Sequence, residues 1–278
     1  MIKTSTQLKA LVRNQSKGNS TKAQIIIRNY IIERFLERVS LSVYRNNIVL
    51  KGGILIASII GASKRSTLDI DSTLKNIELS EESIRTIVQE IINMDINDNV
   101  IFSIQDISTI MEGLDYPGMR VSLVAEIDKM KTPLKLDFST GDFITLREIE
   151  YQYSLMFENR SISVLAYNLE TILAEKFETI VSRATANSRM RDFYDVYMLI
   201  SINESFNTKH FSNALRNTSL KRGTNMIMKD WLMIVNVIKE DEGMQKLWRS
   251  YQNKYDYASN VSWEDVIDAV NTLGDSVL

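Results

Sequence analysis

The sequence predicts an α+β domain followed by an all-helical domain. In the first half of the chain, segments with strand-like and helix-like patterns alternate, and a series of strand-like runs follows them. From about residue 168 onward the patterned segments have helical periodicity, and no proline occurs after Pro133 to interrupt them. The 278 residues are enough for two domains, so we expect one domain at 1–165 and a second at 166–278.

The expected N-terminal domain begins with a long helix. Asn19 or Ser20 can cap this helix, and Ser80 can cap a second one, which has acidic residues in its first turn. An apolar segment between them favours a buried helix, although its periodicity also allows a strand. The expected elements are a helix at 20–42, a strand at 46–51, the buried helix at 54–62, a strand at 66–74, a helix at 80–94, strands at 100–111, 119–127 and 133–139 with a turn at 115–118, and one or two strands within 149–165.

The expected C-terminal domain consists of amphipathic helices. The first of them has apolar residues at i, i+3 and i+4 spacing, which is typical of a helix with one buried face. The expected helices lie at 168–184, 188–201, 209–220, 225–239 and 263–273.

The composition limits the chemistry that the protein can perform. The absence of cysteine excludes disulfides, thiolate nucleophiles and cysteine-ligated metals. There is one histidine, His210, for which a surface or helix-start position is the favoured interpretation. Any catalysis must therefore depend on carboxylates, lysines and metal ions. The formal net charge of −2 argues against a protein that coats nucleic acid, although a local basic patch could still bind it.

The distribution of apolar residues gives no indication of a membrane segment. No apolar run approaches the roughly 20 residues that a membrane-spanning helix needs. The first residues also lack the apolar core of a secretory signal. We therefore expect a cytoplasmic protein without a membrane partner.

A pair of glycines and three aspartates form the first candidate site. Gly52 and Gly53 lie between a strand and a helix, where backbone N–H groups can approach a phosphate. Asp69 and Asp71 project from one face of a strand, and Asp137 lies on a later strand. Converging carboxylates suit Mg²⁺ bound to a triphosphate. An Asp-x-Asp pair alone is weak evidence in a chain with 35 acidic residues, so it is the combination with the glycines that favours a phosphate and metal site over a turn and a charged strand.

Charged residues on two C-terminal helices form a second candidate site. Lys176 lies inside an apolar stripe, so it is either a phosphate ligand or a lysine that extends to solvent from the edge of the stripe. Asp192 and Asp195 lie three residues apart on the next helix. They are either acids near the helix start that pair with neighbouring arginines, or carboxylates that orient Lys176 or a substrate group.

Three stretches of the sequence together resemble a known family: GG with RSTLDID, then LKLDF, then LAEKFETIVSR with RDFYDVYML. They are similar to the AbiEii/AbiGii-type nucleotidyltransferase toxins, of the DNA polymerase β-like nucleotidyltransferase superfamily, over about residues 48–200. The resemblance implies a nucleotidyltransferase-fold N-terminal domain with a mixed β-sheet and flanking helices, followed by an all-helical domain. It also implies the toxin of a bicistronic toxin–antitoxin system, some of which act in abortive phage infection. Relatives transfer nucleotides from NTPs, in several cases to the 3′ end of tRNA, which stops translation.

The resemblance assigns NTP-binding roles to the glycine pair and to two residues before the aspartates. Gly52 and Gly53 would hold the triphosphate, and Gly53 stands where the family often has a serine. Arg65 and Thr67 precede Asp69 at alternate positions and would add to nucleotide binding.

The resemblance also assigns the catalytic residues. The three strand aspartates would bind two Mg²⁺ ions, with Mn²⁺ as an alternative, and the last of them would help to activate the acceptor hydroxyl. The lysine would contact the nucleotide phosphates, and one of the helix aspartates would complete the site. The catalytic residues under this resemblance are Asp69, Asp71, Asp137, Lys176, Asp192 and Asp195.

Two alternative functions remain open at the level of the sequence. The chain could be a catalytically inert nucleotide-binding protein, or it could transfer a nucleotide to a protein instead of RNA. An RNA acceptor would suit the arginines Arg183, Arg189 and Arg191 and the mixed basic and aromatic segments 220–231 and 247–257. The alternative for these segments is that their aromatic side chains pack in the core.

Overall fold

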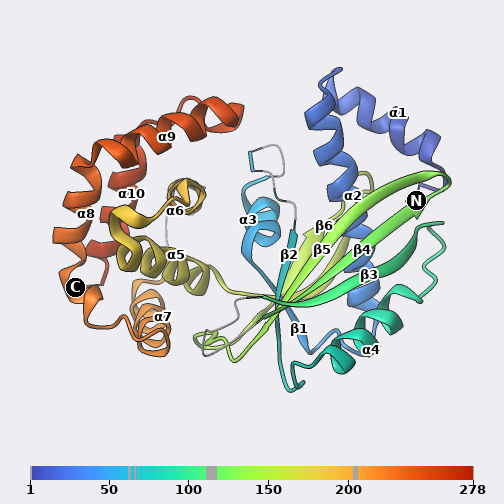
Figure 1. Cartoon of the computed structure of the whole chain (residues 1–278), viewed down its shortest axis with the longest axis horizontal. Coiled ribbons are helices and arrows are strands. Elements are labelled where there is room, and N and C mark those ends of the chain that lie inside the picture. Colours follow the sequence, from blue (N-terminus) through green and yellow to red (C-terminus); the bar gives the residue numbers. More distant parts are fainter. Residues whose placement is uncertain are drawn as a thin grey trace. The chain divides into compact units, whose positions relative to one another are not determined.

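The computed structural model of the chain describes residues 2–61, 64–65, 67, 69–110, 118–202 and 206–277. The chain forms two compact units, and each unit is made of three segments that are not consecutive in the sequence (Figure 1). The first unit comprises Met1–Ser58, Ser66–Asp142 and Ile149–Ala166. The second unit comprises Ile59–Arg65, Phe143–Glu148 and Tyr167–Leu278.

The first unit is built on a mixed β-sheet, as the resemblance implied. In the part of the chain that the structure describes, the sheet has seven strands in the order β3-β4-β5-β2-β1-β7-β6. The neighbours β2 and β5 are parallel, as are β1 and β7, and the other pairs are antiparallel. The strands are β1 (Ile48–Lys51), β2 (Asp69–Leu74), β3 (Ile101–Ile110), β4 (Gly118–Ile127), β5 (Met130–Thr140), β6 (Ile149–Ser154) and β7 (Ser161–Ala166).

Helices of the first unit cover the sheet. Helix α2 packs on β5 and β7, and helix α4 packs on β3, because each presents an apolar face (Figure 1). The residues at the start of α3 are almost completely buried, which explains why its sequence is apolar all round. The helices are α1 (Ser5–Ser16), α2 (Ser20–Leu41), α3 (Gly52–Ile60) and α4 (Glu81–Ile92).

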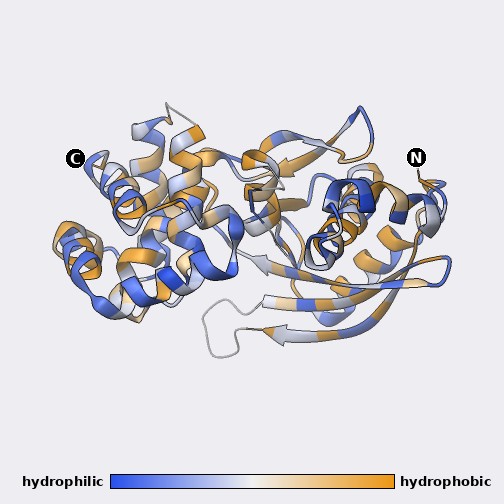
Figure 2. Cartoon of the chain, turned by 90° about the horizontal axis from the view of Figure 1, so that it is seen from above, coloured by the Kyte–Doolittle hydropathy of each residue, from blue (hydrophilic) through white to orange (hydrophobic). Residues whose placement is uncertain are grey.

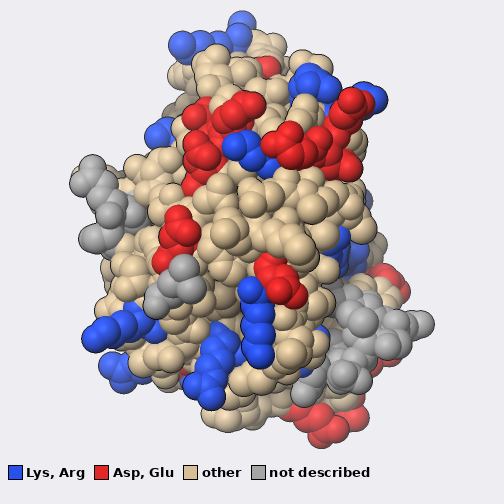
Figure 3. All heavy atoms as spheres, turned by 90° about the vertical axis from the view of Figure 1, so that its left-hand side faces the viewer, with Lys and Arg blue, Asp and Glu red and all other residues tan. Residues whose placement is uncertain are grey.

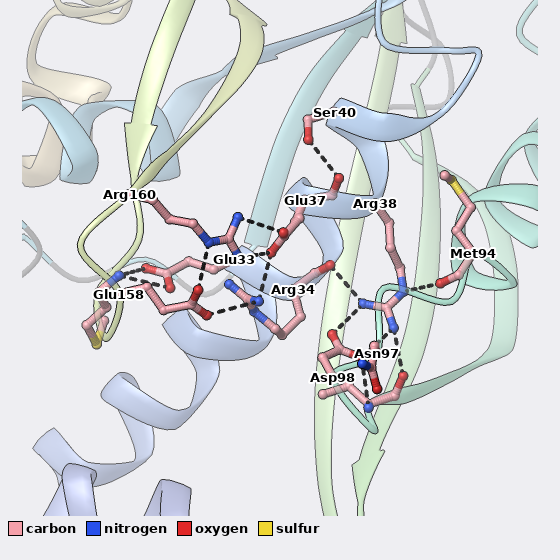
Figure 4. Close-up of polar contacts among 12 residues, drawn as sticks. Glu33, Arg34, Glu37, Arg38, Ser40, Met94, Asn97, Asp98, Glu158 and Arg160 are labelled. Atoms are coloured by element: carbon pink, nitrogen blue, oxygen red, sulfur yellow. Dashed lines mark hydrogen bonds and ion pairs between the residues drawn. The ribbon is translucent and has the colours of Figure 1, made fainter. Parts of the chain in front are cut away.

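Buried charges on α2 tie this helix to the turn between β6 and β7. Arg34 and Arg160 both pair with Glu37, each with its closest nitrogen 2.8 Å from a carboxylate oxygen. The carboxylate of Glu33 accepts the backbone N–H of Met156 at 3.0 and 3.1 Å. Figure 4 shows these side chains turned toward one another between the helix and the turn. The ion pairs compensate charges that the fold removes from water.

The second unit is helical, with α5 at its centre. Helix α5 contacts α6, α7, α8 and α10, and its Phe177 lies against Phe211 and Trp231 at centroid distances of 6.1 and 6.0 Å. Figure 2 shows hydrophobic and hydrophilic residues alternating along these helices, as amphipathic helices require. The helices are α5 (Leu169–Arg183), α6 (Met190–Ile202), α7 (Thr208–Lys221), α8 (Trp231–Glu240), α9 (Glu242–Lys254) and α10 (Trp263–Asp275).

Most of the predicted elements are confirmed, with shifts of a few residues at their ends. The apolar segment expected as a buried helix is α3, and both strands expected within 149–165 are present. The strand expected at 66–74 is confirmed as Asp69–Leu74, while Ser66 and Leu68 lie outside the described residues, as does most of the turn expected at 115–118. Helices α1 and α9 were not predicted. None of the helices that the structure describes is both long enough and apolar enough to cross a membrane.

Candidate active site

The glycine pair lies directly against one of the predicted aspartates. Strand β1 ends at Lys51, and Gly52 and Gly53 are the first two residues of α3. Gly52 has a positive φ of 63°, and a Cβ at this position would collide with the carboxylate of Asp71. The N–H of Gly53 donates to Oδ2 of Asp71 at 3.3 Å. The start of α3 therefore holds a carboxylate, which the positive end of a helix favours.

The three strand aspartates lie on two adjacent strands. Asp69 and Asp71 are on β2, two residues apart and therefore on one face. Asp137 is on β5, which runs parallel to β2, and it pairs in register with Asp71. The structure thus brings these predicted residues together on the central part of the sheet.

An arginine that the sequence analysis did not single out neutralises Asp137. Arg120 lies on β4 directly opposite Asp137. Its Nε donates to Oδ1 of Asp137 at 2.7 Å and its Nη2 donates to Oδ2 at 2.6 Å, so the pair is bidentate. These hydrogen bonds raise the pKa of Arg120 above its usual range. Both oxygens of the third carboxylate are therefore engaged by a cation.

The electrostatics of the first group favour a cation. Burial raises the pKa of Asp71 above its ordinary value, the N–H of Gly53 lowers it, and the nearby carboxylates of Asp137 and Asp69 raise it again. Asp69 and Asp71 offer the hard oxygen donors that Mg²⁺ prefers, so this pair fits a divalent ion. Within the described ranges, however, no group of three or more His, Asp or Glu side chains is arranged to hold a metal ion.

A second polar cluster adjoins Asp71 on the sheet. Lys51 is the register partner of Asp71 on β1, and its Nζ donates to Oγ of Ser139 at 2.7 Å and pairs with Asp142. Thr73 also donates its hydroxyl to Asp142. Burial alone would raise the pKa of Asp142, but Lys51 and these hydroxyls hold it well below its ordinary value. The cluster fixes Lys51 one strand away from Asp71.

The second candidate group lies within the second unit. Nζ of Lys176 on α5 is 2.5 Å from Oδ1 of Asp192 and 3.1 Å from Oδ2 of Asp195, both on α6. Arg65 also pairs with Asp195, through Nε at 2.9 Å and Nη2 at 3.1 Å. The two helix aspartates therefore orient Lys176, and Asp195 is shared by two cations.

Burial and charge act in opposite directions in this group. Burial alone would lower the pKa of Lys176, but Asp195 and Asp192 raise it above its ordinary value. Burial alone would raise the pKa of Asp195, but Arg65 and Lys176 lower it. Lys176 is thus held as an ammonium ion, with a side chain that is 18% exposed.

The positions of Arg65 and Thr67 differ from the prediction. Both were expected to extend the strand face that carries Asp69, but β2 begins at Asp69 itself. Arg65 belongs to the second unit, where its buried guanidinium binds Asp195. Thr67 donates its hydroxyl to the backbone carbonyl of Asp69 at 3.4 Å. The alternation in the sequence extends to residues before Asp69, the first residue of the described strand.

The aromatic residues of the mixed basic segments belong largely to the core. Trp231, Trp248 and Tyr251 are buried, and the indole N–H of Trp248 donates to the carbonyl of Val261 at 3.1 Å. The packing alternative therefore holds for these three side chains. His210 is the third residue of α7, in agreement with the helix-start interpretation.

Comparisons with known proteins identify a family. Residues 34–269 match the family model described as nucleotidyl transferase AbiEii toxin, type IV TA system. No curated protein matches the chain. Among solved structures, a protein of H. pylori assigned as a nucleotidyltransferase is similar, with 17% identity, a TM-score of 0.48, and coverage of 91% of this chain and 94% of the other.

Two further structures are similar at the same low level. JHP933 from Helicobacter pylori has 15% identity and a TM-score of 0.49, with 91% of each chain covered. An antigenic nucleotidyltransferase-like protein from Paracoccidioides brasiliensis has 15% identity and a TM-score of 0.42, with 74% of this chain and 93% of the other covered. At these values the structural similarities add nothing about the reaction.

Proposed function

Because the chain belongs to the AbiEii family of nucleotidyl transferase toxins of type IV toxin–antitoxin systems, we propose that it transfers a nucleoside monophosphate from an NTP to the 3′ hydroxyl of an RNA, with tRNA as the first candidate acceptor. The observation that carries this proposal is the aspartate pair on β2, with Asp71 seated on the start of α3 and Asp137 opposite it. Acids on adjacent strands are suited to neutralising a triphosphate through a divalent ion.

Asp69 and Asp71 would hold Mg²⁺, with Mn²⁺ as an alternative, and Asp137 would be a further ligand. A divalent ion bound there would offset the negative charge of the triphosphate and of the reacting oxygens. The protein contributes the placement of the carboxylates. Gly52 and Gly53 fix Asp71, since the first leaves space for its carboxylate and the second donates a hydrogen bond to it.

The transfer itself is a single displacement at phosphorus. The acceptor hydroxyl oxygen forms a bond to the α-phosphorus, the bond from this phosphorus to the oxygen that bridges it to the β-phosphate breaks, and pyrophosphate leaves with that electron pair. Asp137 accepts the hydroxyl proton, for which an ionised carboxylate is required. Orientation of the two reactants, together with charge neutralisation, supplies most of the rate enhancement in such a reaction.

Lys176 is the proposed phosphate ligand of the second group. Its pairing with Asp192 and Asp195 keeps it charged and restricts its rotamers, both of which favour binding of an anion. Arg65 and Thr67 remain candidates for nucleotide binding. Arg65 would act indirectly, because its guanidinium is engaged with Asp195.

In the cell, transfer to the 3′ end of tRNA would block aminoacylation and stop translation. A cognate antitoxin from the same system would counteract this effect, and a role in phage defence through abortive infection follows from such an arrest. These proposals go beyond the family membership, because they name an RNA acceptor and a physiological role. They also place the protein in the cytoplasm, where tRNA and NTPs are present.

The test is transfer of labelled NTPs to total RNA in the presence of Mg²⁺ by the purified protein. We expect label on RNA of tRNA size with the wild type, at least a hundredfold less with Asp69→Asn, and wild-type labelling with Asp106→Asn, an exposed acid of β3 on the same sheet. Label on protein would support the protein-modifying alternative. NTP binding without transfer to either would support a nucleotide-binding protein.

A further inference from the structure

Four tyrosines of the second unit form a continuous cluster of rings. Tyr194 is on α6 and Tyr251 is on α9, while Tyr255 and Tyr257 follow the end of α9. The ring centroids of Tyr251 and Tyr255 are 4.8 Å apart, and those of Tyr194 and Tyr257 are 5.1 Å apart. The rings of Tyr255 and Tyr257 are 5.3 Å apart at an interplanar angle of 22°, so these two rings are stacked.

The cluster has a buried inner part and an accessible outer part. Tyr194 and Tyr251 are buried, whereas Tyr255 and Tyr257 are only partly buried. The hydroxyl oxygens of Tyr251 and Tyr257 are 3.2 Å apart, within hydrogen-bond distance. The N–H of Ala258 donates to the carbonyl of Tyr255 at 2.8 Å. The outer rings are therefore held in place by the protein itself, which lowers the entropic cost of binding a ligand on them.

Two cations lie beside the ring of Tyr255. The guanidinium carbon of Arg191 is 5.9 Å from the ring centroid, and Nη2 of Arg191 donates to the Tyr255 hydroxyl at 3.3 Å. Nζ of Lys254 is 5.4 Å from the same centroid. Asp256 is the only acid in the segment 251–257, and it is exposed. Aromatic rings accompanied by cations suit a ligand that has both a flat base and phosphates.

The cluster adjoins the group formed by Lys176 and its carboxylates. Tyr194 immediately precedes Asp195 on α6, and Oδ2 of Asp195 is 3.1 Å from Nζ of Lys176. Burial raises the pKa of both Tyr194 and Tyr251 above the ordinary value, and the proximity of Tyr257 and Asp195 raises it further in each case. Asp195 thus acts on the tyrosines and on Lys176 alike, so the rings are neighbours of the proposed phosphate ligand.

The distribution of charge favours a local site for nucleic acid over a broad basic surface. In Figure 3, lysine and arginine side chains are scattered over the face that is shown, with carboxylates and wide uncharged areas between them. The formal net charge of −2 agrees with this distribution. A protein that binds RNA chiefly by neutralising phosphates has a basic patch or stripe, whereas stacking of bases on aromatic rings does not need one.

We propose that Tyr255 and Tyr257, together with Arg191 and Lys254, form a stacking platform for an unpaired base of single-stranded RNA, the proposed acceptor. This inference rests on the proposed function. The base adds its flat face to the stack that the two rings already form, and the two cations contact the adjacent phosphates. A base inside a duplex has both faces covered, so the platform selects unpaired ends.

The test of stacking is the fluorescence anisotropy of a short single-stranded RNA, labelled at its 5′ end and titrated with the full chain without NTP. The wild type binds this strand at least tenfold more tightly than a blunt duplex of the same sequence. Tyr255→Leu removes the aromatic face and weakens binding about tenfold, whereas Tyr255→Phe retains the ring and binds as the wild type does. Tyr44→Leu, at a partly buried tyrosine of the first unit, is the control and leaves binding unchanged.

The salt dependence of binding tests the two cations. Lys254→Gln and Arg191→Gln each remove one phosphate contact, so each reduces the slope of log K against log salt by about 0.7. Lys246→Gln, at an exposed lysine of the same helix, leaves the slope unchanged.

Three results overturn the proposal. They are unaltered binding by Tyr255→Leu with a wild-type circular dichroism spectrum, equal affinity for single strand and duplex, and displacement of the RNA by NTP, which assigns the rings to the base of the NTP. Because binding is measured without NTP, it is independent of transfer. Labelling of RNA by a chain whose RNA binding ignores Tyr255→Leu contradicts the platform alone, and RNA binding that depends on Tyr255 in a chain that labels only protein contradicts the proposed function alone.

Discussion

Three constraints meet at Asp71. Its carboxylate fills the space that a side chain at Gly52 would need, accepts the N–H of Gly53, and lies opposite Asp137 in the sheet. A residue with this many neighbours tolerates little change on any side. The glycine that makes room for it is therefore as much a part of the site as the aspartate.

Substitution of Gly52 separates steric from conformational effects. Gly52→Ala combines a positive φ with a collision against Asp71, and we expect it to lower the free energy of unfolding by about 3 kcal/mol. Gly18 also has a positive φ, but open space surrounds it in the same unit, so Gly18→Ala should cost only about 1 kcal/mol. Urea unfolding curves of the two variants measure the difference. Equal losses would mean that Asp71 can move aside.

Arg120 occupies both oxygens of Asp137, the proposed further metal ligand, so we expect it to compete with a metal ion. Arg120→Gln removes the positive charge and leaves both oxygens of Asp137 available, so we expect Mn²⁺ to bind about tenfold more tightly in a calorimetric titration. Arg85→Gln, which removes an exposed arginine of α4, is the matched control and should bind Mn²⁺ as the wild type does. Weaker binding to the Arg120 variant would show that the arginine organises the site instead of competing for it.

At the scale of elements, charged residues connect α5, α6 and the loop after α3. Asp195 on α6 binds Lys176 on α5 and Arg65 in the loop after α3, and all three belong to the second unit. Removing this shared partner takes one carboxylate away from both cations at once, which is costlier than removing either cation.

Asp195→Ala should therefore destabilise the second unit strongly. We expect a loss of about 3 kcal/mol in the free energy of unfolding, measured by urea denaturation followed through helical circular dichroism. Asp268→Ala, at an exposed position of α10, should change it by no more than about 0.5 kcal/mol. A small effect of Asp195→Ala would indicate that water reaches the two cations.

The link between α2 and the β6–β7 turn should depend on pH. Burial raises the pKa of Glu33 from 4.5 to about 7. Because the pKa of Glu33 is higher in the folded than in the unfolded chain, protonated Glu33 stabilises the folded chain. This contribution is complete below pH 4.5 and is lost as the pH rises through about 7. Relative to Glu33→Gln, the wild type should lose about 3 kcal/mol of unfolding free energy over this interval. Glu82→Gln, at an exposed site of α4, is the control, and parallel curves for wild type and Glu33→Gln would contradict the prediction.

Local patterns in the sequence were sufficient to single out part of the candidate site. Alternation indicated Asp69 and Asp71, and a lysine inside an apolar stripe indicated Lys176, because both signals lie within one element. Arg120 and Lys51 were missed, since each acquires its meaning from a partner on a neighbouring strand and register is not visible in the sequence. Helix α9 was not among the predicted elements, because its mixture of basic and aromatic residues allowed both a nucleic-acid surface and a helix with aromatic side chains in the core.

At the scale of the whole molecule, the two units are interwoven along the chain. The second unit takes Ile59–Arg65 and Phe143–Glu148 from the first 166 residues, and it anchors the former through Arg65 and through the bond from the hydroxyl of Tyr194 to the carbonyl of Lys64 at 2.8 Å. Dividing the chain between residues 165 and 166 would therefore separate Ile59–Arg65 and Phe143–Glu148 from the rest of the second unit.

The isolated segment 166–278 should be less stable than the same helices in the full chain. It lacks Arg65, so Asp195 keeps only one of its two cations. We expect a lower melting temperature by helical circular dichroism, and a similar decrease for Arg65→Met in the full chain. A fragment with the same melting temperature as the helices of the intact protein would show that the loop with Arg65 does not contribute to their stability.

The interwoven chain also sets an order of assembly during synthesis. A ribosome that has made 142 residues has delivered β1 and β2 but not β7, which is the parallel neighbour of β1. The bond between Arg65 and Asp195 joins residues that are 130 positions apart in the sequence. Contacts this distant in sequence form late and slowly. A nascent chain therefore completes neither unit before Ala166 has left the ribosome, so the toxin is still incompletely folded while most of its own sequence is being translated.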